Sequence, residues 1–239
     1  MGFYESIADY YEQIFPDSPA KANFVKESFG SLEGLSLLDI GCAVGKTAIA
    51  LAQECKKVIA LDLDEKMIDM ARNNSRSVPK KPVFYTGDMT KIAKRFEAGS
   101  FDGIICFGNT LVHLNSLARI KDFLEQARTL LAPKGKLLLQ IINYDRILDN
   151  QLSGLPSIEN DRIRFVRNYN YSRETGLIDF ETQLTDKQSG LLINNTVELY
   201  PLRKHDLENV LRQAGFSELN FFGSFMRERY TAESIPLVA

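Results

Sequence analysis

The sequence contains no tryptophan, two histidines and three cysteines. Cys42, Cys55 and Cys106 are an odd number without CxxC spacing, which excludes a disulfide framework and a zinc site, so no metal site is predicted. Unpaired cysteines are typical of a reducing compartment, and we therefore expect a cytoplasmic protein.

Neither sign of charge is in excess, and long apolar runs are absent. The 29 Lys and Arg residues against 31 Asp and Glu give a net charge of -2, so no strong field attracts DNA, RNA or an anionic membrane. No apolar stretch approaches the ~20 residues of a membrane helix, and the N-terminus lacks the basic and apolar blocks of a signal peptide. We expect neither a nucleic-acid nor a membrane partner.

Short apolar runs alternate with helical stretches from residue 35 onward, which predicts a parallel sheet with crossover helices. This is the pattern of a doubly wound, Rossmann-like α/β fold. The predicted strands are 35–40, 58–62, 83–86, 101–107 and 136–143, and the predicted helices between them are 46–54, 64–74 and 117–132.

Further elements flank this core. Apolar residues at near-helical spacing from Phe3 to Ile14 predict a short amphipathic helix, and a second helix begins at Pro19, with Ser18 as its N-cap, and ends at Gly30. Turn signals after residue 150 predict a three-stranded antiparallel meander, then a helix and two closing strands, at 162–171, 177–184, 191–200, 203–214, 218–225 and 234–238.

The segment 37–47 reads as a buried strand, a glycine-bearing turn and the start of a helix, which presents backbone N–H groups to a ligand. A Walker A loop needs four residues between its first glycine and Gly-Lys-Thr, but only three separate Gly41 from Gly45. A dinucleotide fingerprint matches at Gly41 alone, because Ala43 and Lys46 occupy its other glycine positions.

The remaining pattern, Asp39-x-Gly41-x-x-x-Gly45, resembles motif I of the class I S-adenosylmethionine-dependent methyltransferases, with Ala43 in place of the middle glycine of the commoner form. In that family the turn carries the methionine part of the cofactor. The additional methyl group of Ala43 therefore trims affinity without excluding the ligand.

Acids that follow two further strands strengthen the resemblance. It implies that Asp62 accepts hydrogen bonds from both ribose hydroxyls, a role for which a carboxylate has enough lone pairs. Gly87-Asp88-Met89 is similar to the motif whose acid binds the adenine amino group. Each acid alone is equally well explained as a helix cap, but the carboxyl ends of neighbouring parallel strands bring all three to one edge of the sheet.

The segment 101–114 resembles motif IV, whose loop lines the reacting methyl group. Gly108-Asn109 and His113-Leu114, together with Asn143-Tyr144-Asp145, are similar to the glycine and sarcosine N-methyltransferase branch.

One position departs from this branch. The branch has an arginine immediately before its Asn-Tyr-Asp that binds the substrate carboxylate, whereas this chain has Ile142. An apolar side chain cannot form the bidentate pair that a carboxylate requires. Glycine is therefore a poor substrate, and Arg146, Arg203 and Arg227 are candidates for binding another acid.

The resemblance implies a single methyltransferase domain, 1–239, with a seven-stranded, mostly parallel sheet in the order 3-2-1-4-5-7-6. Within it we expect an N-terminal helical lid at 1–30, a cofactor-binding core at 31–150, an antiparallel β cap at 151–200 and closing elements at 201–239.

The resemblance also implies S-adenosylmethionine as cofactor and a small-molecule acceptor, methylated on nitrogen or oxygen by in-line transfer. Asn109, His113 and Tyr144 are the candidate catalytic residues. Tyr11 stands where the family has a tyrosine near the sulfonium, a cation that aromatic faces attract. The implied cofactor-binding residues are Tyr11, Asp39, Gly41, Cys42, Ala43, Gly45, Asp62, Leu63, Met67, Gly87, Asp88, Met89, Phe107, Gly108, Asn109 and His113.

Several alternatives stay open. Tyr11 also fits simple packing on a helix stripe, His113 fits a buried histidine bonded to backbone, and Cys42 and Cys106 fit core positions. The whole chain is alternatively a P-loop-like nucleotide-binding enzyme, or an inactive cofactor-binding fold that acts as a regulator. The sequence does not decide between a monomer and a homodimer.

Overall fold

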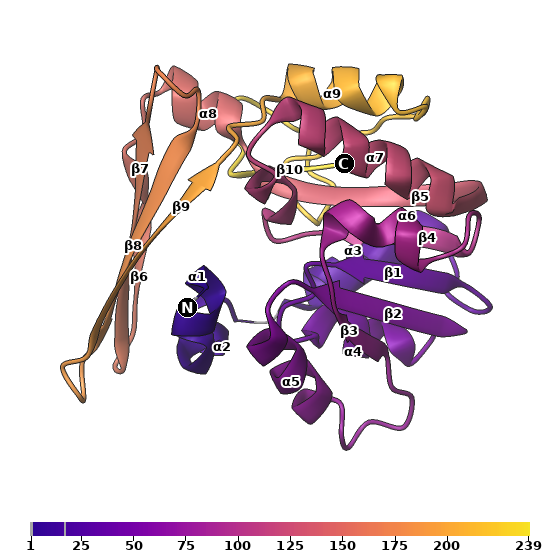
Figure 1. Cartoon of the computed structure of the whole chain (residues 1–239), viewed down its shortest axis with the longest axis horizontal. Coiled ribbons are helices and arrows are strands. Elements are labelled where there is room, and N and C mark those ends of the chain that lie inside the picture. The colour runs from indigo at the N-terminus through magenta and orange to yellow at the C-terminus, as the bar shows by residue number, and fades with distance from the viewer. Residues whose placement is uncertain (1, 17) are drawn as a thin grey trace.

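The computed structural model describes residues 2–16 and 18–239; Met1 and Asp17, which belong to the predicted lid 1–30, lie outside the described residues. The strands of its central sheet are β1 (Ser36–Ile40), β2 (Lys57–Asp62), β3 (Val83–Thr86), β4 (Phe101–Cys106), β5 (Leu131–Ile142) and β10 (Pro236–Val238). They run in the order β10-β5-β4-β1-β2-β3 (Figure 1), with β1 to β5 parallel and β10 antiparallel to β5. The predicted doubly wound, Rossmann-like α/β fold is confirmed.

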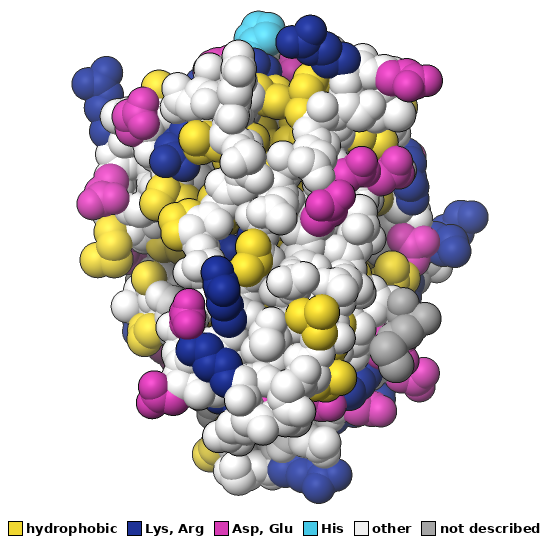
Figure 2. All heavy atoms as spheres, turned by 90° about the vertical axis from the view of Figure 1, so that its left-hand side faces the viewer, with side chains coloured by type: hydrophobic (Ala, Val, Ile, Leu, Met, Phe, Trp, Pro, Cys, Tyr) yellow, Lys and Arg dark blue, Asp and Glu magenta, His cyan; other side chains and the backbone are white. Residues whose placement is uncertain are grey.

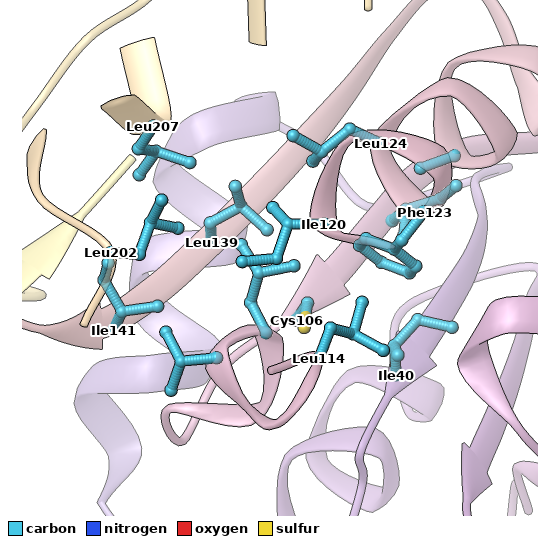
Figure 3. Packing of buried hydrophobic residues seen from close by; sticks show 14 of the residues in the cluster. Ile40, Cys106, Leu114, Ile120, Phe123, Leu124, Leu139, Ile141, Leu202 and Leu207 are labelled. Carbon is cyan, nitrogen blue, oxygen red and sulfur yellow. The ribbon is translucent and has the colours of Figure 1, made fainter. Parts of the chain in front are cut away.

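Helices cover both faces of this sheet. Leu38 and Ile40 belong to the same core cluster as residues of α7 and α9, whereas Leu37 belongs to a cluster with residues of α3 and α4. Figure 3 shows the first of these clusters, with Cys106 packed among leucine and isoleucine side chains. The helices around the sheet are α3 (Pro19–Phe29), α4 (Lys46–Ala52), α5 (Glu65–Asn74), η2 (Met89–Lys91), α6 (Ile92–Arg95), η3 (Thr110–His113), α7 (Leu117–Leu130), α8 (Tyr144–Asp149) and α9 (Lys204–Gln213).

The outer edge of the sheet corrects the predicted strand count and order. Residues 218–225, expected to be the sixth of seven strands, form only isolated bridges from Phe222 to Arg229 and Val238. Phe222 and Phe225 instead pack edge-to-face on Phe24 of α3. Aromatic packing therefore holds this segment in place of the β-ladder hydrogen bonds that were expected. The central sheet of the described residues has six strands.

A second, antiparallel sheet forms from the region after α8. It has four strands where three were predicted: β6 (Gly154–Glu159), β7 (Ile163–Tyr171), β8 (Ile178–Asp186) and β9 (Leu192–Leu199), in that order. The prediction missed β6 because Gly154 and Pro156 are unfavourable in strands. β6 lies at the edge of the sheet, where a proline removes no ladder hydrogen bond from a central position.

The N-terminal segment lies between this antiparallel sheet and the core (Figure 1). The single predicted helix is divided into α1 (Phe3–Ile7), η1 (Ala8–Tyr10) and α2 (Tyr11–Ile14). Ile7 and Ile14 pack with Phe165 of β7, and the Tyr10 hydroxyl donates to Asp186 Oδ2 at 2.9 Å. These contacts fix the segment against the cap, and the predicted boundaries of lid, core and cap stay a prediction.

No helix in the described part of the chain combines the length and the apolar character needed to cross a membrane.

Candidate functional site

The turn after β1 is held in a conformation that exposes its backbone. Gly41 has φ of +70°, and its N–H and that of Cys42 both donate to Leu61 O at the end of β2. Gly45, with φ of +78°, is the N-cap of α4. Ala43 also lies in the left-handed region, at φ of +46°, where only glycine is free of strain.

Asp62, the last residue of β2, ties this turn to the neighbouring strand. Its Oδ2 accepts from Ala43 N at 2.8 Å, and its Oδ1 accepts from Asp64 N at 3.0 Å. Burial raises the pKa of Asp62, opposed by these backbone N–H groups. Each carboxylate oxygen has a second lone pair, and Asp62 lines a cavity.

Asp39 is the least satisfied group of the site. Its side chain is 4% exposed, and its Oδ2 has no hydrogen-bond partner among the described residues. Burial raises its pKa to about 7, while nearby Lys21 favours the ionised form. A buried acceptor without a donor is costly, about 1–3 kcal/mol. Asp39 lines the same cavity, so a bound donor can satisfy it there.

The cavity has a volume of about 680 Å³ and is lined by residues that follow β1, β2, β3 and β4 and by the N-terminal helices. It brings together nearly all of the predicted cofactor-binding residues; Gly45 and Asn109 are not in its lining. The predicted residues that line it are Tyr11, Asp39, Gly41, Cys42, Ala43, Asp62, Leu63, Met67, Gly87, Asp88, Met89, Phe107, Gly108 and His113.

Asp88 caps a helix and also lines the cavity, and its contact with adenine stays a prediction. Its Oδ1 accepts from Thr90 N at 2.8 Å, which caps η2, and the residue also lines the cavity. The backbone and side chain of Thr90, with Lys91, outweigh the effect of burial and lower the pKa of Asp88. An ionised carboxylate therefore faces this end of the cavity.

A tyrosine and a histidine contact each other in the cavity lining. The Tyr4 hydroxyl of α1 lies 3.1 Å from His113 Nε2 of η3, and both residues line the cavity. Burial lowers the pKa of His113 to about 4, and burial together with Asp62 raises that of Tyr4. At neutral pH both groups are uncharged, so the hydroxyl can donate to the ring nitrogen.

Comparison with known proteins finds methyltransferases among the similar sequences and structures. A family model described as "Methyltransferase domain" matches residues 37–135. The chain is 26% identical over 206 residues to the glycine/sarcosine/dimethylglycine N-methyltransferase of Actinopolyspora halophila, covering 80% of this chain and 33% of that protein. It is 24% identical to the glycine/sarcosine N-methyltransferase of Halorhodospira halochloris, covering 93% of this chain and 82% of that one.

The fold agrees with this result. The structure of an S-adenosylmethionine-dependent methyltransferase from Clostridium acetobutylicum matches with a TM-score of 0.83 at 17% identity, covering 99% of this chain and 97% of that one. Together with the family model over residues 37–135 and the N-methyltransferase relatives, this match supports a class I S-adenosylmethionine-dependent methyltransferase. The chain spans about a third of the length of the Actinopolyspora relative.

The cofactor of this family, S-adenosylmethionine, fits the groups present. The unpartnered Asp39 Oδ2 suits a cationic donor such as the ammonium of the methionine portion, and the free lone pairs of Asp62 suit ribose hydroxyls. Nothing lies within 4 Å of where a Cβ on Gly108 would stand, so the backbone there is open to a ligand. Within residues 2–16 and 18–239, no three His, Cys, Asp or Glu side chains gather to hold a metal ion.

Two of the candidate catalytic residues lie outside the cavity lining of this methyltransferase. Asn109 Nδ2 donates to the Tyr144 hydroxyl at 3.0 Å, and Asn109 Oδ1 accepts from Ile142 N at 3.0 Å. Tyr144 is 1% exposed. Their hydrogen bonds connect the loops after β4 and β5, and His113 is the candidate catalytic residue that reaches the cavity.

Sequence reasoning missed several lining residues, among them Tyr4, Lys21, Thr110 and Val197. A signal existed for Tyr4, because it stands seven residues before Tyr11, and such a pair shares one face of a helix. The two rings lie 6.4 Å apart. No local pattern marks Lys21 or Val197, since their position depends on how α3 and β9 pack.

We expect the Asp39 carboxyl to make binding of the cofactor pH-dependent. Its pKa of about 7 exceeds the unfolded value of 3.8, so its contribution to stability is lost as the pH rises from about 4 through 7. An ammonium group beside it favours ionisation, so binding of S-adenosylhomocysteine at pH 6 is expected to release a proton, and affinity is expected to rise towards pH 8. Calorimetry at pH 6 in two buffers of different ionisation enthalpy measures this release, which Asp39→Asn should abolish. Equal heats in both buffers would contradict it.

Proposed function

We propose that the protein transfers the methyl group of S-adenosylmethionine to nitrogen of a small-molecule acceptor. The observation that carries this proposal is the cavity at the ends of the parallel strands, whose lining combines Asp39 and Asp62 with Tyr4, Tyr11 and His113. Its volume of about 680 Å³ falls within the ~300–1,000 Å³ of small-molecule sites.

The charge distribution supports a small acceptor over a nucleic acid. The net charge is -2, and on the face seen in Figure 2 basic and acidic side chains are interspersed. A polynucleotide acceptor calls for a cluster of basic residues to bind its phosphates. The three cysteines are unpaired, which supports a cytoplasmic location.

The state of His113 supports nitrogen over an alcohol oxygen. The bound cofactor supplies a methyl group that the positive sulfur already activates. With a pKa of about 4, His113 is a weak base and cannot deprotonate an alcohol efficiently at neutral pH. An amine that binds in its neutral form presents its lone pair without a base, and the ammonium formed by methylation releases its proton to water. The residues of the cavity therefore need only orient the amine during the transfer, and orientation can contribute ~7–11 kcal/mol.

The test is turnover on a matched panel of acceptors. The protein is incubated with S-adenosylmethionine and small amines, each paired with the corresponding alcohol, and S-adenosylhomocysteine and methylated product are quantified by mass spectrometry. We expect stoichiometric methylation of an amine and none of its alcohol partner. Methylation of the alcohols alone would contradict nitrogen as the target. Cofactor binding without turnover across the panel would favour the inactive, regulatory alternative.

A further inference from the structure

A row of polar side chains crosses the inward face of the four-stranded sheet. Arg167 of β7 pairs in register with Thr182 of β8, which pairs with Asn195 of β9. The adjacent rows are apolar or aromatic, comprising Phe165, Leu184 and Ile193 on one side and Tyr169, Phe180 and Val197 on the other. Three polar residues thus interrupt a face that is otherwise built for packing.

Strand alternation shows that this row faces inward. Phe165 and Tyr169 of β7 are buried, whereas Arg164 and Asn168 are exposed. Arg167 shares the face of the buried residues because side chains two apart lie on one side of a strand. Charged side chains are common on the outer surface of the molecule on the side where this sheet lies (Figure 2). On the inner, buried face of a sheet a charged side chain is unusual.

Two residues of this row and one of the adjacent row have polar atoms without partners in the described part of the chain, whereas Asn195 donates to Ser6 Oγ at 2.8 Å. Thr182 Oγ1, Tyr169 Oη and Arg167 Nε have no hydrogen-bond partner among the described residues, and Thr182 and Tyr169 are each only 4% exposed. Buried polar groups in folded proteins are nearly always satisfied, so three neighbouring exceptions indicate a missing ligand.

Arg167 also has no counter-charge. It donates to Pro156 O, and none of the described carboxylates forms an ion pair with it. Burial lowers its pKa, yet a guanidinium stays protonated in proteins. An arginine placed on an inner face without a carboxylate is suited to an anion that comes from outside the chain.

Two of the three arginines that the sequence offered for this role are already engaged, whereas the Nε of the third, Arg146, has no hydrogen-bond partner among the described residues. Arg203 contacts the carboxylates of Asp145 and Asp149 at 3.1 and 2.7 Å. Arg227 contacts Glu27 at 3.2 Å, and Arg146 lies 3.8 Å from Glu233.

The row adjoins the cavity. Val197, in the neighbouring row, lines the cavity, and the Phe180 ring lies 5.8 Å from that of Phe3, which lines it too. Tyr169 in turn stacks at 5.3 Å on Phe180. Val197 of β9 and Arg167 of β7 are one row and two strands apart, which is ~7 Å along the strands and ~10 Å across them. Arg167, Thr182 and Tyr169 lie beyond the cavity lining, so an acceptor must extend about 12 Å from Val197 under the sheet to reach Arg167.

We propose that Arg167, Thr182 and Tyr169 form a subsite for an anionic group of the methyl acceptor, a carboxylate or a phosphate remote from the methylated nitrogen. The proposal rests on the proposed function, because the acceptor must lie in the cavity beside the cofactor. The guanidinium supplies the charge, and the two hydroxyls supply hydrogen bonds that orient the anion. Arg167 thereby selects acceptors and takes no part in the transfer.

The test uses acetate and inorganic phosphate as probes, with acetamide as the uncharged match of acetate. Each is titrated into the complex of the protein with S-adenosylhomocysteine, and its dissociation constant is measured by ligand-observed NMR. We expect one of the two anions to bind and acetamide not to bind. The anion that binds identifies the group. Arg167→Met should weaken its binding about tenfold to hundredfold, whereas Arg164→Met, on the outer face of the same strand, should leave it unchanged.

The outcomes separate the two proposals. If S-adenosylhomocysteine itself does not bind the wild-type protein, the proposed function fails. If it binds normally but neither anion binds, or Arg167→Met binds both as well as the wild type does, the anion subsite is wrong. Should Arg167→Met not fold, Thr182→Val and Tyr169→Phe carry the same test, with affinity for S-adenosylhomocysteine as the measure of an intact core.

Discussion

Asp62→Ala is expected to weaken binding of S-adenosylhomocysteine by about 1.5–3 kcal/mol, which is about tenfold to hundredfold. The carboxylate lines the cavity and is the acceptor that the family resemblance assigns to the ribose hydroxyls, and its two oxygens also accept from the N–H groups of Ala43 and Asp64. Removal of the Asp62 carboxylate therefore has two effects: the contact with the ligand is lost, and the turn after β1 loses the hydrogen-bond acceptor of its Ala43 N–H group. Isothermal titration calorimetry measures the effect directly.

Asp69→Ala is the matched control for this substitution. Asp69 is an exposed acid on α5, paired with Arg72 at 2.9 Å, and it is not part of the cavity lining. The control should bind S-adenosylhomocysteine as the wild type does. Wild-type affinity in Asp62→Ala would show that the ribose assignment is wrong.

Gly41→Ala is expected to lower the free energy of unfolding by about 2–5 kcal/mol. A Cβ there would stand 2.5 Å from both Cγ2 and Oγ1 of Thr110, which adds overpacking of about 1–3 kcal/mol. The φ of +70° adds about 1–2 kcal/mol of left-handed strain. Urea denaturation with a constant m-value isolates the change in stability.

Gly99→Ala separates the two causes. Gly99 has φ of +68° with nothing within 4 Å of a Cβ, so only the strain should remain there. In the Gly41→Ala background, Thr110→Ala should restore part of the lost free energy of unfolding, because it removes Cγ2 and Oγ1, the two atoms closest to the new Cβ. Equal losses for Gly41→Ala and Gly99→Ala would contradict the close approach of Thr110 to the turn.

The position of the acids could be predicted because it follows from local rules. Asp39 and Asp62 belong to strands that the sequence marks by runs of apolar residues. Parallel pairing brings the carboxyl ends of such strands to the same edge of the sheet. The glycine turn could be predicted for the same reason, since a left-handed conformation and a following helix require Gly41 and Gly45.

Features that depend on tertiary packing could not be predicted. Asn109 is a non-glycine residue with φ of +66°, and this conformation is accompanied by its hydrogen bond to Tyr144. β6 contains a glycine and a proline and exists because β7 offers it an edge. The outer strand at 218–225 is lost to packing on Phe24, a contact between segments about 200 residues apart.

The central claim is that the cavity at the ends of β1 and β2 takes S-adenosylmethionine and its product. The most direct test is calorimetric titration of the wild-type protein with S-adenosylhomocysteine and, separately, with magnesium ATP. We expect one molecule of S-adenosylhomocysteine to bind per chain and no heat of binding with magnesium ATP. Tight binding of magnesium ATP without binding of S-adenosylhomocysteine would contradict this expectation and establish the P-loop-like alternative.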